Sequence, residues 1–129
     1  MAATSKTVYT PEAPKPIGPY SQAVVSGGFV FCSGQLGLDP ITGEMPGRTA
    51  AEQAERALMN LRAVLIRAGS DVSHVVKVTI FLKNIKDFDE VNRVYTKFFD
   101  DNKPARSAVE VSELPRGALV EIEAVAEVR

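Results

Sequence analysis

The segment TAAEQAERALMNLRAVLIRAG, residues 49–69, is the clearest element of the chain, and the fold class is worked out from it. Thr49 and Glu52, three residues later, form a capping-box pattern, and Gly69 supplies a helix stop. Between them, apolar residues recur at helical spacing: Ala54, Ala57, Leu58, Leu61, Val64 and Leu65. The segment therefore predicts an amphipathic helix over residues 50–68 with one buried face.

A second, shorter helix is predicted further along the chain. Asp87 and Glu90 repeat the capping pattern, and the apolar positions after them again share one helix face: Val91, Val94, Tyr95 and Phe98. We expect this helix to end before Pro104, because the residue preceding a proline disfavours the helical conformation.

Strand-like runs rich in apolar and β-branched residues flank the two helices: Gln22–Val25, Phe29–Ser33, Val75–Leu82, Ser107–Val111 and Leu119–Val128. The first two predict a hairpin through Gly27 and Gly28. In the last run, apolar residues at 120, 122, 124, 126 and 128 alternate with residues 121, 123, 125 and 127. Successive side chains of a strand point to opposite faces, so the first set should meet the helices.

This order of elements predicts an α+β fold, with one mixed sheet and two helices packed on a single face. The other face would carry Ser107, Val109, Val111 and Val125, which are too apolar for a broad surface in water. We expect a second copy of the chain to cover it. With 129 residues, 45% of them hydrophobic, the chain is predicted to be one domain, 1–129, in which residues 1–6 are flexible.

Composition argues against several functions. The net charge is −1 and the 15 basic residues are scattered, so nucleic-acid binding is not expected. Cys32 lies in an apolar run, which favours a buried, inert thiol. With one histidine, His74, and one cysteine, the chain cannot form the usual Cys/His zinc site, and no metal is expected. No apolar run approaches membrane-spanning length, so a cytoplasmic protein is expected, although an organellar protein without its targeting segment would look the same.

Nucleophilic hydrolysis is also disfavoured. A serine–histidine–acid triad would have to use His74, which we interpret as a surface or cap histidine, and no Gly-x-Ser-x-Gly elbow is present. The run from Ser33 to Gly37 lacks the Gly-Lys-Ser/Thr of a phosphate loop and is interpreted as a strand exit.

The remaining candidates are one guanidinium, one phenol, one hydroxyl and one carboxylate. The planar fork of Arg106 matches a carboxylate bidentately, which suits it to hold a small organic acid. Each candidate also has an ordinary interpretation: a surface salt bridge for Arg106, packing for Tyr20, a strand-end hydroxyl for Ser33 and a solvated carboxylate for Glu121. Spacing alone favours these ordinary interpretations.

Three segments together resemble the Rid (RidA/YjgF, reactive intermediate deaminase) family: Ile17–Ala23, Pro104–Ser107 and Glu121–Ala126. The resemblance covers nearly the whole chain. It implies a chorismate-mutase-like homotrimer with active sites in the clefts between subunits. It assigns Arg106 to the substrate carboxylate, Tyr20 and Ser33 to the pocket lining, and Glu121 to the catalytic water.

The resemblance also bears on two other positions. Ala108 stands where many bacterial members carry cysteine, but the role attributed to that residue is a main-chain contact with substrate, which alanine preserves. Asn92 matches a Val-Asn pair of the family, although it could equally stabilise a neighbouring loop.

The implied activity is hydrolysis of 2-iminobutanoate or 2-iminopropanoate, released by pyridoxal-phosphate enzymes, to the 2-keto acid and ammonia without any cofactor. The alternatives are a non-catalytic sensor of keto or amino acids, a ribonuclease or translation inhibitor, and a chaperone-like role for which the sequence has no feature. Residues that set substrate side-chain tolerance are expected in the loops Gly37–Arg48 and Glu113–Gly117.

Overall fold

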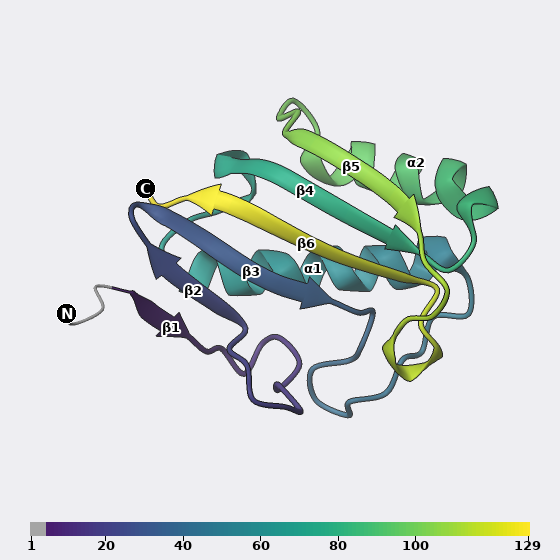
Figure 1. Ribbon diagram of the computed structural model, residues 1–129, viewed down its shortest axis with the longest axis horizontal. Coiled ribbons are helices and arrows are strands. Elements are labelled where there is room, and N and C mark those ends of the chain that lie inside the picture. The colour runs from purple at the N-terminus through teal and green to yellow at the C-terminus, as the bar shows by residue number, and fades with distance from the viewer. Residues whose placement is uncertain (1–4) are drawn as a thin grey trace.

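A computed structural model describes residues 5–129 and places both α-helices against one face of a single sheet (Figure 1). The strands are β1 (Lys6–Val8), β2 (Ala23–Ser26), β3 (Phe29–Gln35), β4 (Val75–Leu82), β5 (Ala105–Glu110) and β6 (Val120–Glu127). The helices are α1 (Ala50–Arg67) and α2 (Phe88–Phe99), with short 3-10 turns η1 (Val72–His74), η2 (Ile85–Asp87) and η3 (Pro115–Gly117).

The sheet is mixed. Its strand order is β1-β2-β3-β6-β4-β5, and every neighbouring pair is antiparallel except β4 and β5, which α2 connects as a crossover. The predicted fold class is therefore confirmed. β6, the last strand along the chain, lies in the middle of the sheet between β3 and β4 (Figure 1).

The predicted first helix is confirmed together with its capping box. The Thr49 side chain accepts a hydrogen bond from the Glu52 amide at 3.1 Å, and the Glu52 carboxylate accepts one from the Thr49 amide at 3.2 Å. Both orphan amides at the start of α1 are thereby satisfied. β4 has the predicted bounds, and β5 begins at Ala105, so Arg106 lies inside a strand.

The predicted cap of the second helix is wrong. Asp87 makes no side-chain capping bond, because η2 runs directly into α2 and leaves Asp87 in a helical conformation instead of the extended one that an N-cap needs. Glu90 instead accepts a hydrogen bond from the Ala51 amide at 3.0 Å. It thus adds a carboxylate to the N-terminal turn of α1, where the helix dipole favours negative charge.

A short strand at the start of the described chain was not predicted. β1 pairs with β2 in the register Lys6↔Val25, Thr7↔Val24 and Val8↔Ala23. Three residues are too few for a visible alternation, so only the partner strand defines this one. Lys6 belongs to this strand, residues 1–4 lie outside the described residues, and the flexibility of residues 1–6 stays a prediction.

The two faces of the sheet differ as predicted from the last strand. Val120, Ile122, Ala124 and Ala126 are buried against the helices, together with Leu58, Leu61 and Leu65 of α1. The helix-free face carries Val109, 42% exposed, and Phe31, 48% exposed, which pairs with Val125. That a second copy covers this face stays a prediction. Within residues 5–129, neither α-helix combines the length and apolarity needed to cross a membrane.

Candidate functional site

Arg106 is held against the helix side of the sheet edge. It pairs with the buried Val78 in the β4–β5 register, so its side chain extends toward α2. Its Nη1 donates a hydrogen bond to Asn92 Oδ1 at 2.7 Å. The centre of its guanidinium lies 4.6 Å from the Tyr95 ring centroid and 5.2 Å from that of Phe88. Positions 88, 92 and 95 share one face of α2, so one helix face cradles the cation.

The cation has no acidic partner in the described part of the chain. The ion pairs among residues 5–129 do not include Arg106, so the ordinary interpretation as an intrachain salt bridge is excluded for these residues. A guanidinium has five N–H donors, and the bond to Asn92 is the only hydrogen bond that Arg106 makes within this range. The fork is therefore oriented yet available to an external carboxylate.

Tyr95 provides the apolar surface beneath the guanidinium. Its hydroxyl is buried and finds no hydrogen-bond partner among residues 5–129. Burial raises the pKa of Tyr95 above its ordinary value of 10.0, and the nearby charge of Arg106 opposes part of that rise. The phenol consequently stays neutral at physiological pH and acts here through its ring face.

Ala108 lies two residues beyond Arg106 and on the same face of β5. Together with Phe88 and Arg106 it lines an open cavity of about 500 Å³. Of the residues predicted to form the site, the structure therefore brings Ala108 and Arg106 together, and Asn92 joins them.

Glu121 lies on the opposite, helix-free face of the sheet. It packs so tightly on β3 that a Cβ atom at Gly34 would lie 2.8 Å from the Glu121 Cδ atom and 2.9 Å from Cγ. Only glycine leaves room for the carboxylate in this position. Burial raises the pKa of Glu121 above its ordinary value of 4.5, and the negative charge of Glu123 raises it further.

A cavity of about 190 Å³ surrounds the carboxylate. It is lined by Pro14, Lys15, Ile17, Tyr20, Gln22, Gly34, Gln35, Leu36, Leu38, Pro115, Arg116 and Glu121. The phenol of Tyr20 and the carboxylate of Glu121 thus share one cavity. Apolar side chains form much of the remaining wall.

Ser33 supports this cavity from behind. Its hydroxyl donates to the Ser21 carbonyl oxygen at 2.6 Å, and its amide donates to the Gln22 carbonyl oxygen at 2.9 Å. The bulge of β3 next to Gly34 is thereby joined to the segment that carries Tyr20. In this chain the Ser33 side chain positions a neighbouring segment, and its hydroxyl oxygen can still accept hydrogen bonds through its two lone pairs.

Sequence reasoning missed Gln22, which is 1% exposed. Its Nε2 donates to the carbonyl oxygens of Thr10 and Pro14 at 3.0 Å each, and its Oε1 accepts from the Thr10 amide at 2.7 Å. Gln22 thereby fixes the backbone that carries Pro14, one wall of the cavity. The available signal was a polar residue at the start of an apolar strand, which calls for a buried hydrogen-bond partner.

A single chain does not bring Arg106 and Glu121 into one site. Arg106 aligns with Val78 and then Ala124 across the sheet, so Glu121 lies two strands away and three residues along, on the other face. With strands about 4.8 Å apart and a rise of about 3.3 Å per residue, each offset is about 10 Å. The structure therefore contains two clusters: an arginine cluster of Arg106, Ala108, Phe88, Asn92 and Tyr95, and a carboxylate pocket around Glu121, Tyr20 and Gly34.

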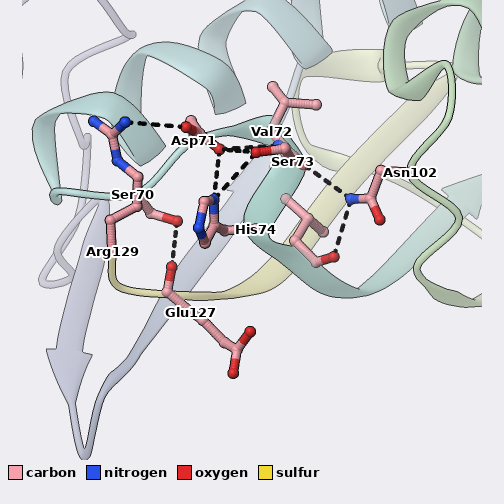
Figure 2. A network of polar contacts seen from close by, with 9 residues as sticks. Ser70, Asp71, Val72, Ser73, His74, Asn102, Glu127 and Arg129 are labelled. Atoms are coloured by element: carbon pink, nitrogen blue, oxygen red, sulfur yellow. Dashed lines mark hydrogen bonds and ion pairs between the residues drawn. The ribbon is translucent and has the colours of Figure 1, made fainter.

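Cys32 and His74 lie outside both clusters. Cys32 is buried, as expected, and burial raises the pKa of its thiol to about 12. His74 Nδ1 lies 2.8 Å from Asp71 Oδ1, within a network that also holds Ser73 and Arg129 (Figure 2). No three histidine, cysteine, aspartate or glutamate side chains in the described range are grouped so that they could hold a metal ion.

The fold and the two clusters define an α+β protein with a cationic cluster and a carboxylate pocket on opposite faces of one sheet. The family model described as Endoribonuclease L-PSP matches residues 10–128. The chain belongs to this family, which is the Rid (YjgF) family that its motifs resemble.

Individual relatives match over nearly their full lengths. A RutC family protein of Pyrococcus abyssi is 49% identical over 121 residues, covering 94% of this chain and 95% of that protein. The human 2-iminobutanoate/2-iminopropanoate deaminase is 46% identical over 121 residues, covering 94% of this chain and 88% of that protein. The crystal structure of Escherichia coli TdcF with bound serine has a TM-score of 0.91 at 41% identity, covering 96% of this chain and 99% of that chain.

Proposed function

We propose that this protein hydrolyses small 2-imino acids, such as 2-iminobutanoate and 2-iminopropanoate, to the 2-keto acid and ammonia. The observation that carries the proposal is the arginine cluster, in which the Arg106 fork is oriented by α2 but has no carboxylate partner within residues 5–129. The human relative is named for this reaction, and TdcF holds serine, which also bears a carboxylate beside a small side chain. These similarities support the same substrate class here.

The proposed site forms between copies of the chain. Because Arg106 and Glu121 lie on opposite faces of the sheet, one copy would supply the arginine cluster and its neighbour the carboxylate pocket. The exposed apolar side chains of the helix-free face, among them Phe31 and Val109, supply a surface for the contact. We propose a homotrimer, the assembly that the family resemblance implies, with its active sites in the clefts between subunits.

The proposed chemistry needs orientation and one proton acceptor. Arg106 binds the substrate carboxylate, which places the electrophilic imine carbon beside Glu121 of the neighbouring copy. A water oxygen attacks that carbon while Glu121 accepts one water proton, the C=N π electrons move to the nitrogen, and Glu121 passes the proton to that nitrogen. In the resulting carbinolamine, Glu121 accepts the hydroxyl proton and passes it to the amino nitrogen. The C–N bond then breaks as the C=O bond forms, and ammonia leaves.

The raised pKa of Glu121 suits this role. A carboxylate with an ordinary pKa is a weak base, whereas partial burial increases its basicity. The proposed steps consume one water and release one ammonia, so they need neither a redox partner nor a cofactor.

The test is a coupled assay in which an amino-acid oxidase generates the imine and semicarbazide traps it. Wild-type protein should suppress the trapped adduct. Arg106→Ala should lower activity about a hundredfold or more, because unpairing a carboxylate in a closed cleft costs about 3–5 kcal/mol and each 1.36 kcal/mol is roughly a factor of ten in rate. Arg62→Ala, at an exposed arginine on α1, is the matched control and should behave as wild type. Full turnover by Arg106→Ala would refute the assignment.

A non-catalytic sensor is the second candidate, and the serine bound to TdcF favours it, since serine is not an imine. A sensor would gain thermal stability from serine or a keto acid and yet leave the trapped adduct unchanged. The family model's description also raises ribonuclease activity. RNA binding with a steep salt dependence would support that activity, whereas the net charge of −1 argues against it.

A further inference from the structure

Part of the carboxylate pocket is a loop that α1 holds in place. Asn60, which is fully buried on α1, donates through Nδ2 to the Leu36 and Leu38 carbonyl oxygens at 3.1 and 2.9 Å. Gly37, between them, packs on the helix so closely that a Cβ atom there would lie 2.6 Å from the Gln53 carbonyl oxygen. A buried amide left unpaired is costly, so this part of the wall is fixed.

A second loop, which carries Pro115 and Arg116, completes the wall. It is joined at two points to the first loop, which runs from Leu36 to Gly47. At the base, the buried side chain of Gln53 donates to the Gly47 carbonyl oxygen at 3.0 Å and accepts from the Leu119 amide at 2.8 Å. At the rim, Arg116 Nη2 donates to the Gly43 carbonyl oxygen at 3.0 Å. This exposed Arg116–Gly43 bond, the rim clasp, is the weaker of the two connections, since solvent competes for it.

The conformation of Arg116 is itself unusual. Its φ angle is +61°, in the left-handed region that residues other than glycine adopt rarely. The turn holds this conformation while the side chain reaches Gly43 across the pocket rim. Arg116 therefore both lines the cavity and ties together the two loops that bound it.

The wall between these loops is apolar. Leu36, Leu38, Pro115 and Ile17 line the cavity together with Glu121. One liquid water occupies about 30 Å³, so a cavity of about 190 Å³ holds on the order of six water-sized groups. This is room for the attacking water and a short aliphatic chain.

We propose that Ile17, Leu36, Leu38 and Pro115 form the subsite for the substrate side chain, and that the rim clasp limits the length of that side chain. The proposal rests on the proposed deaminase function and sets an upper limit on the length of the aliphatic side chain that the site accepts. Arg116 is then a specificity-determining residue that acts by holding the two loops together. It leaves the carboxylate to Arg106 and the water to Glu121.

The experiment compares imines generated from alanine, 2-aminobutyrate, norvaline and norleucine. Wild-type kcat/KM should fall at the longest side chain. Arg116→Ala should raise the norleucine-to-alanine ratio of kcat/KM by about tenfold, because one methylene in a hydrophobic pocket is worth roughly 10–200-fold. Arg116→Lys, which can still donate to Gly43, should restore the wild-type ratio. Leu38→Ala, which enlarges the cavity directly, should raise the same ratio while leaving the Arg116–Gly43 bond intact.

Two results would overturn the subsite. One is an unchanged ratio in both Arg116→Ala and Leu38→Ala. The other is a wild-type preference for the glutamate-derived imine that Arg116→Ala removes, which would make Arg116 a ligand for a second carboxylate.

Failure of the proposed function has a different signature. If wild-type protein hydrolyses none of the imines, the keto acids from pyruvate to 2-oxohexanoate are titrated by thermal shift. If thermal stabilisation falls for the longer keto acids and Arg116→Ala removes that fall, the subsite is supported without catalysis. If stabilisation does not depend on chain length, the subsite is overturned.

Discussion

Asn92 anchors the most important side chain of the proposed site. It accepts the one hydrogen bond that Arg106 makes in the described range, and the Phe88 and Tyr95 rings beside the cation provide no hydrogen-bond acceptor to Arg106 in that range. The amide oxygen therefore decides which edge of the fork faces the substrate. Asn92 was recognised in the sequence only as a family match, because its partner lies 14 residues away.

We predict that Asn92→Ala raises KM for the imine about tenfold and changes kcat little. A hydrogen bond to a charged group contributes about 1.5–3 kcal/mol, and exposure of this pair places the effect at the low end. Asn92→Asp should be worse, because its carboxylate would pair with Arg106 and compete with the substrate. Steady-state kinetics of both variants provide the measurement, and an unchanged KM in Asn92→Asp would contradict the orienting role.

Glu121 gives the proposed reaction a defined pH dependence. Its carboxylate must be ionised to accept a proton, and its pKa is raised above 4.5, so kcat should decline on acidification at a higher pH than an ordinary glutamate would cause. Glu123→Gln removes the second cause of the raised pKa and should move this decline to lower pH. A pH–rate profile checks both points, and an identical profile for Glu123→Gln would exclude the electrostatic coupling.

The same carboxylate affects stability in the opposite direction. Because the pKa of Glu121 is higher in the folded state than in the unfolded state, its contribution to stability is present at low pH and lost as the pH rises through the folded-state pKa. Glu121→Gln, which removes the charge, should therefore favour the folded state near neutrality. This arrangement is typical of functional sites, where stability is given up for reactivity.

At the scale of elements, a polar network around Asp71 joins the segment before β4 to the end of the chain after β6. Asp71 accepts hydrogen bonds from the amide and hydroxyl of Ser73 at 3.0 and 2.6 Å, and it contacts His74 and Arg129 (Figure 2). These contacts lower the pKa of Asp71 from its ordinary value of 3.8 to about 2, with the Ser73 hydrogen bond as the largest cause and His74 next. The network ties the start of β4 to the residues that follow β6.

We predict that Asp71→Asn lowers Tm at pH 7 by about 1–4 °C, because asparagine can still cap the turn and only the charged contacts with His74 and Arg129 are lost. Because the pKa of Asp71 is lowered by folding, its stabilisation is present above pH 3.8 and is lost as the pH falls toward 2. The Tm values of the two proteins should therefore converge in that window. Thermal unfolding followed from pH 7 to pH 2 gives the test, and a difference that stays constant would rule out the charged form as the cause.

The elements that sequence predicted correctly are those with local signals. The helix after Thr49 carries its own cap and apolar repeat, and Val75–Leu82 carries its own β-branched run, so their bounds needed no partner. β1 and the role of Glu90 depend on β2 and on the start of α1, and both were missed. The three family segments contain Tyr20, Arg106 and Glu121, but only the register of the sheet divides these residues between two clusters.

At the scale of the whole molecule, the division of the site predicts an obligate assembly. Arg106→Ala and Glu121→Gln should each be inactive alone. After the two are mixed, unfolded and refolded together, about one quarter of the clefts would combine two intact halves if trimers form at random, and activity should return to about that fraction. The coupled assay measures the recovery. If mixed trimers, confirmed by sedimentation, recover no activity, Arg106 and Glu121 must act within one chain.

The central position of β6 has a consequence for how the chain is made. Synthesis proceeds from β1 onward, so β1–β3 and β4–β5 would emerge from the ribosome as two separate half-sheets. Neither half can complete its hydrogen bonding until residues 120–127 arrive and pair with both β3 and β4. Translation that stops before Val120 would release two unjoined edges, each a template for aggregation.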